Sequence, residues 1–320
     1  MKIVNQSAHI IEPTAPMKHI ERIGRVCYKS EDKIDDGTDK NFVKMLFSRK
    51  HFAMLEHYRF IMKVPCVIYK HLAEVRPRHV EMTNENNNHI ISLNARALIG
   101  LQENCSPYST VAGLIIAGIR DELIGHIVKR YDCHELFGWS RDKNVILSAN
   151  VEFVENNELA MSPYEYSRHG WFSAHFITDR GITHELVRHR EEISFAQEST
   201  RYCNYGSDRF DDITVIDQDF EDGSYIRDQW IIGCEMACDC YSRMLSNNVT
   251  PQMARSVLPT CLKTEIIMTA PIYEWNHVFD LRLNGITGAP HPKMKELMRM
   301  LYDDIQRREN NDTCSNHKRN

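Results

Sequence analysis

Residues 170–190 contain a strand pattern that passes directly into a helix pattern. Residues 170–178, GWFSAHFIT, are rich in aromatic and β-branched side chains, which is typical of a strand. Residues 179–188, DRGITHELVR, then favour a helix, and the segment ends in the basic run Arg188-His189-Arg190. The chain must therefore build a fold that accommodates a strand and a helix joined without a long loop.

The same pattern occurs earlier in the chain. Residues 58–64, YRFIMKV, alternate like a strand, and a helix ending in HLAEVRPRH follows them. Residues 58–79 and 170–190 thus each predict a strand, a helix and a basic cluster. This similarity indicates either a degenerate duplication or chance, since two copies are too few for a repeat array.

The remaining elements are predicted from periodicity, caps and breakers. Thr38 is a plausible helix cap, and residues 85–89, ENNNH, are predicted to form a loop. Helices are predicted at 15–28, 39–50, 111–130, 225–245, 250–257, up to 281, and at 292–308, with strands at 144–153 and 264–270 and a strand running into a helix at 90–101. Residues 309–320 are predicted to be a disordered tail.

Charge and composition narrow the class of protein. The net charge of −5 argues against a protein that lives on nucleic acid, although a local arginine cluster can still bind a small anion. The first residues lack the apolar region of a signal peptide, and no apolar run reaches the length of a membrane span. We therefore expect a cytoplasmic protein that contacts neither membrane nor nucleic acid.

The 10 cysteines are scattered, which is typical of free thiols in a reducing compartment. Cys234, Cys238 and Cys240 form the tightest group and lie in a predicted helix. They have no second CxxC and no nearby pair of histidines, so we expect no metal site. Cys203 follows a polar segment without an adjacent base, which favours a buried thiol over a nucleophile.

The run Arg188-His189-Arg190 alone predicts only a solvated helix end, where positive charge is favourable. Three consecutive residues cannot share one helix face, so they straddle the end and reach two sides. The following segment, ISFAQESTRY, changes the interpretation. Its Ser, Thr and Arg side chains and consecutive N–H groups are suited to a phosphate, and its Gln and Glu to a base or ribose.

The segment resembles the signature of flavin-dependent thymidylate synthases, in which RHR is followed by seven or eight residues and then Ser. Here eight residues separate Arg190 from Ser199. Segments similar to the family also occur in the family's order at 51–57 (HFAMLEH), 254–259 (ARSVLP), 274–282 (EWNHVFDLR) and 291–297 (HPKMKEL). The resemblance covers roughly the first 65 residues and residues 170–300.

The resemblance implies reductive methylation of dUMP to dTMP. FAD would carry hydride from NADPH, and 5,10-methylenetetrahydrofolate would supply the carbon. It also implies an α/β (α+β) fold with a central, mostly antiparallel sheet flanked by helices, and a homotetramer with sites between subunits. Residues 1–308 would form one catalytic domain, with 66–169 as an atypical insertion.

The resemblance also implies roles for individual residues. Arg282 would activate the pyrimidine and His51 would lie near the flavin as a second catalytic candidate. Arg255 would reach dUMP from another subunit. The cofactor would contact Arg188, His189, Arg190, Gln197 and His277. The substrate would contact Glu185, Arg188, Gln197, Glu198, Ser199, Thr200, Arg201, Arg255 and Arg282.

Two features depart from the family pattern. Glu191 and Glu192 follow RHR, where carboxylates would repel a flavin phosphate unless they point away. The late helix should begin with Asn-x-Arg, but Pro271 and Tyr273 stand there. Within the insertion, Asn94-Ala95-Arg96 resembles the missing helix start, so we expect Asn94 and Arg96 to supply this flavin contact, the alternative being an ordinary amphipathic helix.

The departures leave two rival functions open. One is a related pyrimidine-nucleotide flavoenzyme with altered chemistry, such as hydroxymethyl transfer. The other is a non-catalytic module that binds nucleotides or RNA, against which the acidic charge counts.

Overall fold

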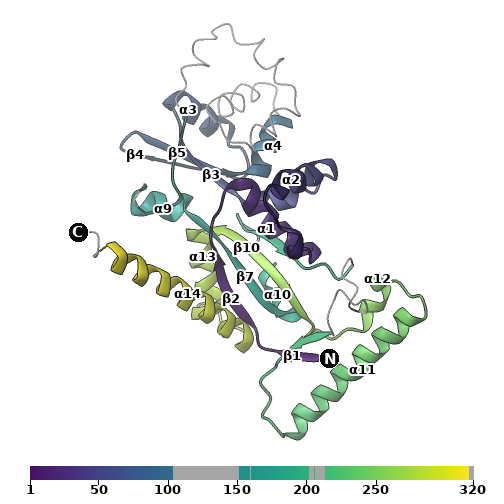
Figure 1. The fold of residues 1–320 in the computed structure, drawn as a ribbon. Coiled ribbons are helices and arrows are strands. Elements are labelled where there is room, and N and C mark those ends of the chain that lie inside the picture. Colours follow the sequence, from purple (N-terminus) through teal and green to yellow (C-terminus); the bar gives the residue numbers. More distant parts are fainter. Residues whose placement is uncertain (104–150, 159, 202–204, 206–212, 317–320) are drawn as a thin grey trace.

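The computed structural model describes the chain except for residues 104–150, 159, 202–204, 206–212 and 317–320. The described residues form two four-stranded antiparallel sheets, one above the other in Figure 1, and a small parallel pair of strands. The predicted helix at 111–130, the start of the strand predicted at 144–153, Cys203 and the polar segment 206–211 lie outside the described residues. The α/β (α+β) class with helix-flanked antiparallel sheets is confirmed, with two such sheets instead of one.

The lower sheet in Figure 1, here called sheet II, has the order β2-β7-β10-β8. Its strands are β2 (Ser7–Ile11), β7 (Trp171–Asp179), β10 (Lys263–Pro271) and β8 (Ser194–Gln197). Helix α10 (Arg180–Leu186) continues β7 and α13 (Ile272–Phe279) continues β10. One face of the sheet packs with α13 and α14 (Pro292–Asn316), and the other packs against α1 (Pro16–Tyr28).

The upper sheet, sheet I, has the order β4-β5-β3-β6. Its strands are β3 (Arg59–Lys63), β4 (Val80–Glu85), β5 (Asn88–Asn94) and β6 (Glu152–Phe153), with α3 (Cys66–Val75) after β3 and α4 (Ala95–Glu103) after β5. Asn86 and Asn87 both have positive φ and make the tight turn between β4 and β5, as asparagine readily does. The expected insertion is therefore most of a sheet, because β3, which precedes it, pairs with β5 and β6.

Helices α1 and α2 (Thr38–Ser48) and the 3-10 segment η2 (Phe52–His57) cover sheet I. Their apolar side chains form the largest core cluster, together with those of β3, β5 and α4. A short 3-10 turn, η1 (Glu31–Lys33), joins α1 to α2, and α9 (Pro163–His169) leads into β7. Ser162 and Glu165 form a reciprocal capping box at the start of α9, which fixes where that helix begins.

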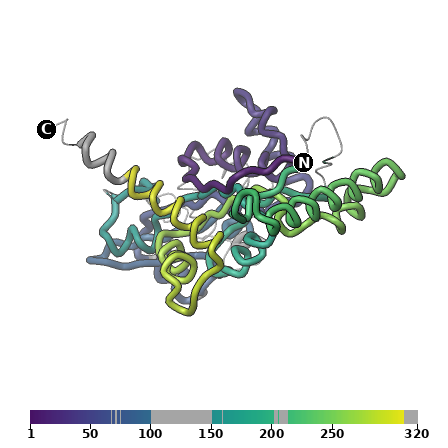
Figure 2. The backbone as a smooth tube through the Cα atoms, turned by 90° about the horizontal axis from the view of Figure 1, so that it is seen from below, coloured from purple at the N-terminus to yellow at the C-terminus, as the bar shows by residue number. Residues whose placement is uncertain are grey.

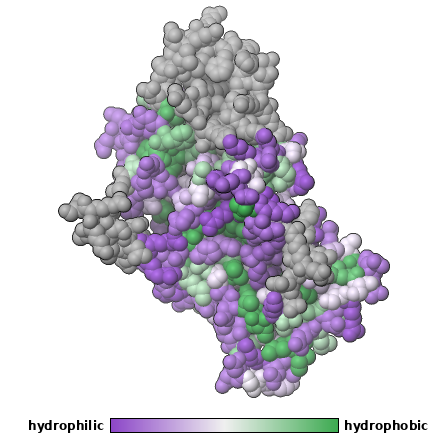
Figure 3. Space-filling model, viewed as in Figure 1, coloured by the Kyte–Doolittle hydropathy of each residue, from purple (hydrophilic) through white to green (hydrophobic). Residues whose placement is uncertain are grey.

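The C-terminal third extends away from the sheets. Helix α11 (Tyr225–Ser246), α12 (Pro251–Ala254) and η3 (Arg255–Val257) project on one side, and α14 runs toward the other (Figure 2). Strands β1 (Lys2–Val4) and β9 (Thr214–Ile216) pair in parallel beside them. Figure 3 shows a mostly hydrophilic face, with hydrophobic side chains gathered in its lower half.

Two predictions about this third can be judged. Helix α14 runs to Asn316, beyond its predicted end at residue 308, in a segment that has neither Pro nor Gly to end a helix. The helix predicted for the cysteine group is confirmed, with Cys234 and Cys238 buried in α11 and Cys240 exposed. Within the described part of the chain, no group of side chains could hold a metal ion and no helix is long and apolar enough to cross a membrane.

Two buried histidines join sheet I to sheet II. His57, at the end of η2, places its Nδ1 atom 2.7 Å from Thr269 Oγ1 of β10. His169, at the end of α9, lies between Thr83 and Ser92 of sheet I, at 2.8 and 2.9 Å. Burial lowers the pKa of each histidine to about 3, so both are neutral in the folded protein.

These histidines predict that stability falls in mild acid. An unfolded histidine titrates near pH 6.5, so between pH 6.5 and about 3 the unfolded chain binds the additional protons. Their contribution is complete above pH 6.5 and decreases by roughly 1.4 kcal/mol per pH unit for each histidine below it. Urea unfolding at pH 7, 6 and 5 measures this slope.

The variant His57→Gln/His169→Gln should show a shallower pH slope than the wild type, whatever its stability at pH 7. Exposed His184 provides the matched control, and His184→Gln should leave the slope unchanged. An unchanged slope in the double variant would contradict this assignment.

Candidate functional site

The basic run lies beyond the end of a short helix. Asp179 caps α10 by accepting a hydrogen bond from the N–H of Ile182 at 2.7 Å, and the helix ends at Leu186. Arg188 and Arg190 are exposed, whereas His189 between them is buried. The run therefore follows the helix end instead of straddling it as expected, but it does face two sides, with His189 buried between two exposed arginines.

Arg282, in the turn that follows α13, connects the basic run to the C-terminal part of the chain. Its Nε donates to His189 Nε2 at 3.0 Å, and its guanidinium also donates to a Glu185 carboxylate oxygen at 3.0 Å. The ring of His277 meets that of His189 edge-on, with centroids 6.4 Å apart. Four residues chosen from the sequence, almost 100 positions apart, thus form one cluster.

This cluster fixes the protonation of His189. Burial, the charge of Arg282 and the neighbouring His277 together lower the pKa of His189 to about 4. The Nε2 atom of His189 accepts the hydrogen bond from the Nε–H of Arg282, so the ring is neutral and carries its own proton on Nδ1. Arg282 stays charged and is oriented by Glu185 within a turn of π-helix, η4 (Asp280–Asn284).

The segment predicted to hold a phosphorylated ligand lies at the end of β8. Gln197 donates to Thr183 at 3.0 Å and is 3.3 Å from Thr264, so its amide is fixed from two sides. Arg255 donates to Thr200 Oγ1 at 2.8 Å within the same chain. Ser199 is half-buried and Arg201 is exposed.

Glu198 belongs to a buried charge network that the sequence did not predict. Its carboxylate accepts from Tyr205 at 2.7 Å and lies 3.5 Å from Lys263 and 3.8 Å from Lys29. Both lysines also bind Glu265. The only local signal is the spacing of Lys263 and Glu265, which puts both on one face of β10.

Glu265 shows how strongly this network is charged. Burial alone would raise its pKa, but the hydrogen bond from His175 and the charges of Lys263 and Lys29 hold the pKa far below its usual range. Although burial opposes it, the neighbouring carboxylates of Glu265 and Glu198 raise the pKa of Lys29. Glu265 and Lys29 therefore stay ionised, and the network holds the start of the 198–201 segment in place.

The two glutamates after the basic run differ in environment. The carboxylate of Glu192 binds Arg59 of β3 at 2.9 Å and His79 at 3.1 Å, with the backbone of Glu192 at a φ of 50°. Its charge is thus neutralised and turned toward sheet I. Glu191 is exposed.

The early candidates lie near sheet I. His51 is exposed and its Nδ1 is 2.7 Å from the hydroxyl of Tyr28. Asn94 caps α4 by accepting from the N–H of Ala97 at 2.8 Å, and Arg96 forms an ion pair with Glu56. None of these contacts reaches Arg282 itself.

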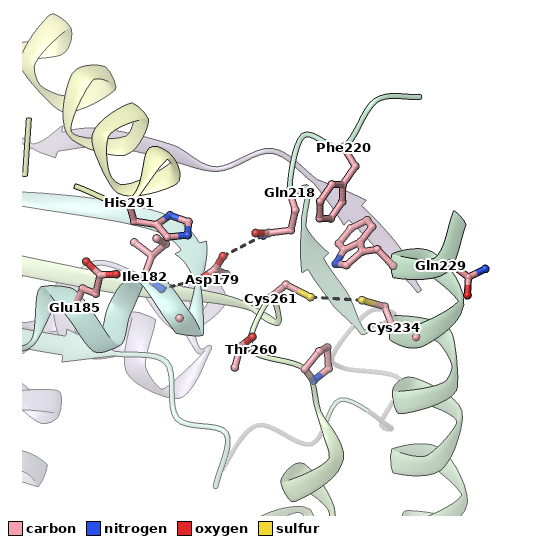
Figure 4. A pocket seen from close by; sticks show the side chains of 14 residues that line it. Asp179, Ile182, Glu185, Gln218, Phe220, Gln229, Cys234, Thr260, Cys261 and His291 are labelled. Carbon is pink, nitrogen blue, oxygen red and sulfur yellow. Dashed lines mark hydrogen bonds between the residues drawn. The ribbon is translucent and has the colours of Figure 1, made fainter. Parts of the chain in front are cut away.

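A cavity of about 550 Å³ opens on the other side of α10, between this helix, α11 and residues 259–261 (Figure 4). Glu185 lines it, as do Asp179, Cys261 and His291, which the figure labels. Cys234 and Cys261 face each other at its wall, 3.5 Å apart, and burial raises the pKa of Cys234 to about 12. Glu185 thus connects the cavity with the Arg282 cluster.

Comparison with known proteins identifies the family of this chain. Residues 149–308 match the family described as "Thymidylate synthase complementing protein". This match spans half of the chain and contains the basic run, the 197–201 segment and Arg282. The chain belongs to this family.

Several curated relatives are called flavin-dependent thymidylate synthase. That of Pyrococcus furiosus is 32% identical over 104 residues, covering 32% of this chain and 42% of the relative. That of Pyrococcus horikoshii is 28% identical and covers 46% of this chain and 60% of the relative. The chain thus spans about half the length of the curated relatives it matches. A solved structure, the UMP/dUMP methylase PolB from Streptomyces cacaoi, is 13% identical over 94% of this chain and 90% of that one, with a TM-score of 0.37.

The Arg282 cluster predicts a measurable change in the titration of His189. In Arg282→Ala a nearby positive charge disappears and water gains access, so the pKa of His189 should rise from about 4 toward the ordinary value near 6.5. Histidine ring resonances followed by NMR between pH 3 and 8 measure this. Arg299→Ala, at an exposed position of α14, should not move the resonance; a His189 titration identical in all three proteins would refute the cluster.

Proposed function

We propose that this protein is a flavin-dependent thymidylate synthase that methylates dUMP to dTMP, with FAD, NADPH and 5,10-methylenetetrahydrofolate. The observation that carries the proposal is the meeting of Arg282, Glu185 and His189 beside the 197–201 segment. Family membership and the names of the curated relatives support it.

The residues present fit a flavin nucleotide. Arg188 and Arg190 are exposed, on either side of a buried neutral histidine, and neither has an ion pair among the described residues. Two such guanidinium groups are suited to a diphosphate, which they can bind bidentately. FAD bound there would supply hydride chemistry, and Gln197 and His277 would border its ring system.

The substrate dUMP would lie along the 198–201 segment. Ser199, Thr200 and Arg201 offer hydroxyl and guanidinium donors to a phosphate, and Arg255 supports Thr200 from α12 and η3. Glu198, held in the charge network, is placed to accept from a sugar hydroxyl. A fixed anchor for the phosphate orients the pyrimidine relative to Arg282.

Arg282 would act on the pyrimidine ring. Position C5 of uracil becomes nucleophilic when N3 loses its proton, and a fixed cation stabilises the resulting anion. Arg282 provides such a cation because Glu185 and neutral His189 orient it without moving its proton. The same proposal includes the other roles expected from the resemblance. His51 would lie near the flavin, and the protein would be a cytoplasmic homotetramer in which Arg255 contacts the dUMP of another subunit.

The proposed function predicts the outcome of one assay. Purified protein with FAD, NADPH, methylenetetrahydrofolate and dUMP should form dTMP, and Arg282→Ala should lower kcat/KM for dUMP about 100-fold or more, because it removes a preorganised cation. Product mass is measured by chromatography and mass spectrometry.

Arg299→Ala is the matched control and should retain wild-type activity. Formation of a hydroxymethylated nucleotide instead of dTMP would contradict the proposed methylation and indicate hydroxymethyl transfer. Absence of any product, together with wild-type behaviour of Arg282→Ala toward dUMP, would reject the proposal.

A further inference from the structure

The two sheets share one topology. Sheet I in the order β6-β3-β5-β4 matches sheet II in the order β2-β7-β10-β8 in its last three strands, whereas β6 follows these strands in the chain and β2 precedes them. In each sheet the second strand continues into a helix, α3 or α10, and so does the third, α4 or α13. We call residues 52–103 the first unit, and residues 163–197 with 263–284 the second unit.

Strand register aligns the two units residue by residue. Arg59 opens β3 and pairs with Asn94, the last residue of β5. Trp171 opens β7 and pairs with Pro271, the last residue of β10. The duplication suspected from the sequence therefore extends beyond one strand and helix, and Asn94 corresponds to Pro271.

The contacts between the units are reciprocal. His57 and His169 each stand two residues before the corresponding strand, β3 or β7. His57 of the first unit binds Thr269 of the second, and His169 of the second binds Ser92 of the first. Ser92 and Thr269 occupy equivalent positions, two residues before Asn94 and Pro271. The units therefore face each other like the halves of a twofold dimer.

This exchange creates two equivalent junctions. η2 of the first unit packs on β8 and β10 of the second, and α9 of the second packs on β4 and β5 of the first. At one junction, the loop after α10 meets the helix start at residues 94–96. By equivalence, the loop after α3 and the helix start at residues 271–273 make up the other junction, and His79 of that loop binds Glu192 of the loop after α10.

The two helix starts differ in the residues that could bind an anion, and the first unit keeps the polar and basic ones. The first unit keeps Asn94 and Arg96, where the second has Pro271 and Tyr273. Proline has no N–H to donate, and a tyrosine carries no positive charge. Tyr273 is covered by the guanidinium of Arg168, 4.0 Å from its ring centroid.

The segments that end the fourth strand of each sheet differ in the opposite sense, because here the second unit keeps the residues suited to an anion. By register Gln197 and Glu198 of the second unit match Asn84 and Glu85 of the first. The second unit continues with Ser, Thr and Arg at 199–201, but the first continues with the tight turn at Asn86 and Asn87. The first unit also carries Arg-Pro-Arg at 76–78 where the second carries Arg-His-Arg.

The helix start of the first unit and the basic-run loop of the second unit, which keep their binding residues, belong to the same junction. Ser194, at the start of β8, donates to the backbone oxygen of Glu56 at 3.2 Å, and the carboxylate of Glu56 binds Arg96. From the basic-run loop, Glu192 binds Arg59, the strand partner of Asn94. These links bring residues 192–194 of the second unit close to residues 94–96 of the first.

A buried guanidinium at this junction points to a ligand or bound water. Arg59 is 4% exposed, and its Nε and one terminal nitrogen have no hydrogen-bond partner among the described residues. Buried donors of a charged group are costly when unpaired. Capping uses only the amide oxygen of Asn94, which leaves its NH₂ group for other partners.

We propose that the chain is a fused pair of diverged units with one flavin site, in which Asn94 and Arg96 of the first unit complete the site begun by residues 188–190 of the second. The other junction, between 76–78 and 271–273, binds no cofactor. This inference rests on the proposed function, since it assigns the two halves to the same FAD molecule.

FAD affinity of the full chain tests the proposal, measured by quenching of flavin fluorescence. Arg96→Ala should weaken binding by roughly 10-fold or more, because a charge-assisted contact is lost. Arg96→Lys should bind FAD with an affinity between those of the wild type and Arg96→Ala, since lysine keeps the charge without the planar fork. Arg78→Ala removes an equally exposed arginine from the other junction and should bind FAD as the wild type does.

The outcomes separate this proposal from the proposed function. If Arg96→Ala binds FAD as tightly as wild type, or Arg78→Ala weakens it equally, this proposal is overturned while dTMP formation by the wild type stands. If the wild type takes up no FAD, both proposals fail. Melting temperatures of all variants, unchanged within a few degrees, show that a weaker affinity does not arise from unfolding.

Discussion

The crossed pair of buried histidines is the constraint on which the rest of the structure depends. His57 reaches from η2 into sheet II, and His169 reaches from α9 into sheet I. Each ring must be neutral, because a charged imidazole in these surroundings would be desolvated without a counter-ion. Their hydrogen bonds hold each leading segment on the opposite sheet and so fix where the loops of one unit meet the helices of the other.

The distribution of charge follows from this docking. Two carboxylates beside the basic run are neutralised by protein partners, Glu192 by Arg59 and Glu185 by Arg282. Arg188 and Arg190 remain exposed, so a chain with a net charge of −5 still presents a local positive surface to an anion. The same pairing that joins the two units thus prevents Glu192 from repelling a phosphate.

Local sequence was sufficient for much of the site. The strand and helix at 170–188 and the basic run near a helix end are found as expected. The structure also brings together Glu185, His189, His277 and Arg282, which the sequence had named as separate candidates. These features depend on neighbouring residues or on a resemblance carried by short segments. The polar composition of residues 309–316 does not indicate the helical continuation of α14 to Asn316, although this segment contains no Pro or Gly.

Strand register and long-range charge pairing could not be predicted. Asn94 and Pro271 become equivalent only when β3 pairs with β5 and β7 with β10, and nothing in a single strand specifies its partner. The network of Lys29, Glu198 and Glu265 joins residues up to 236 positions apart, so no local pattern reveals it. The insertion consequently resembled an addition to the fold, whereas it contains most of one of two matching units.

A crystal structure of the full chain with FAD and a dUMP analogue tests the central claim most directly. The account predicts one flavin for each chain, between residues 188–190 and residues 94–96, with the nucleotide along 198–201. Flavin density at the junction of 76–78 and 271–273, or a flavin bound at 188–190 without contact to Asn94 and Arg96, would contradict it.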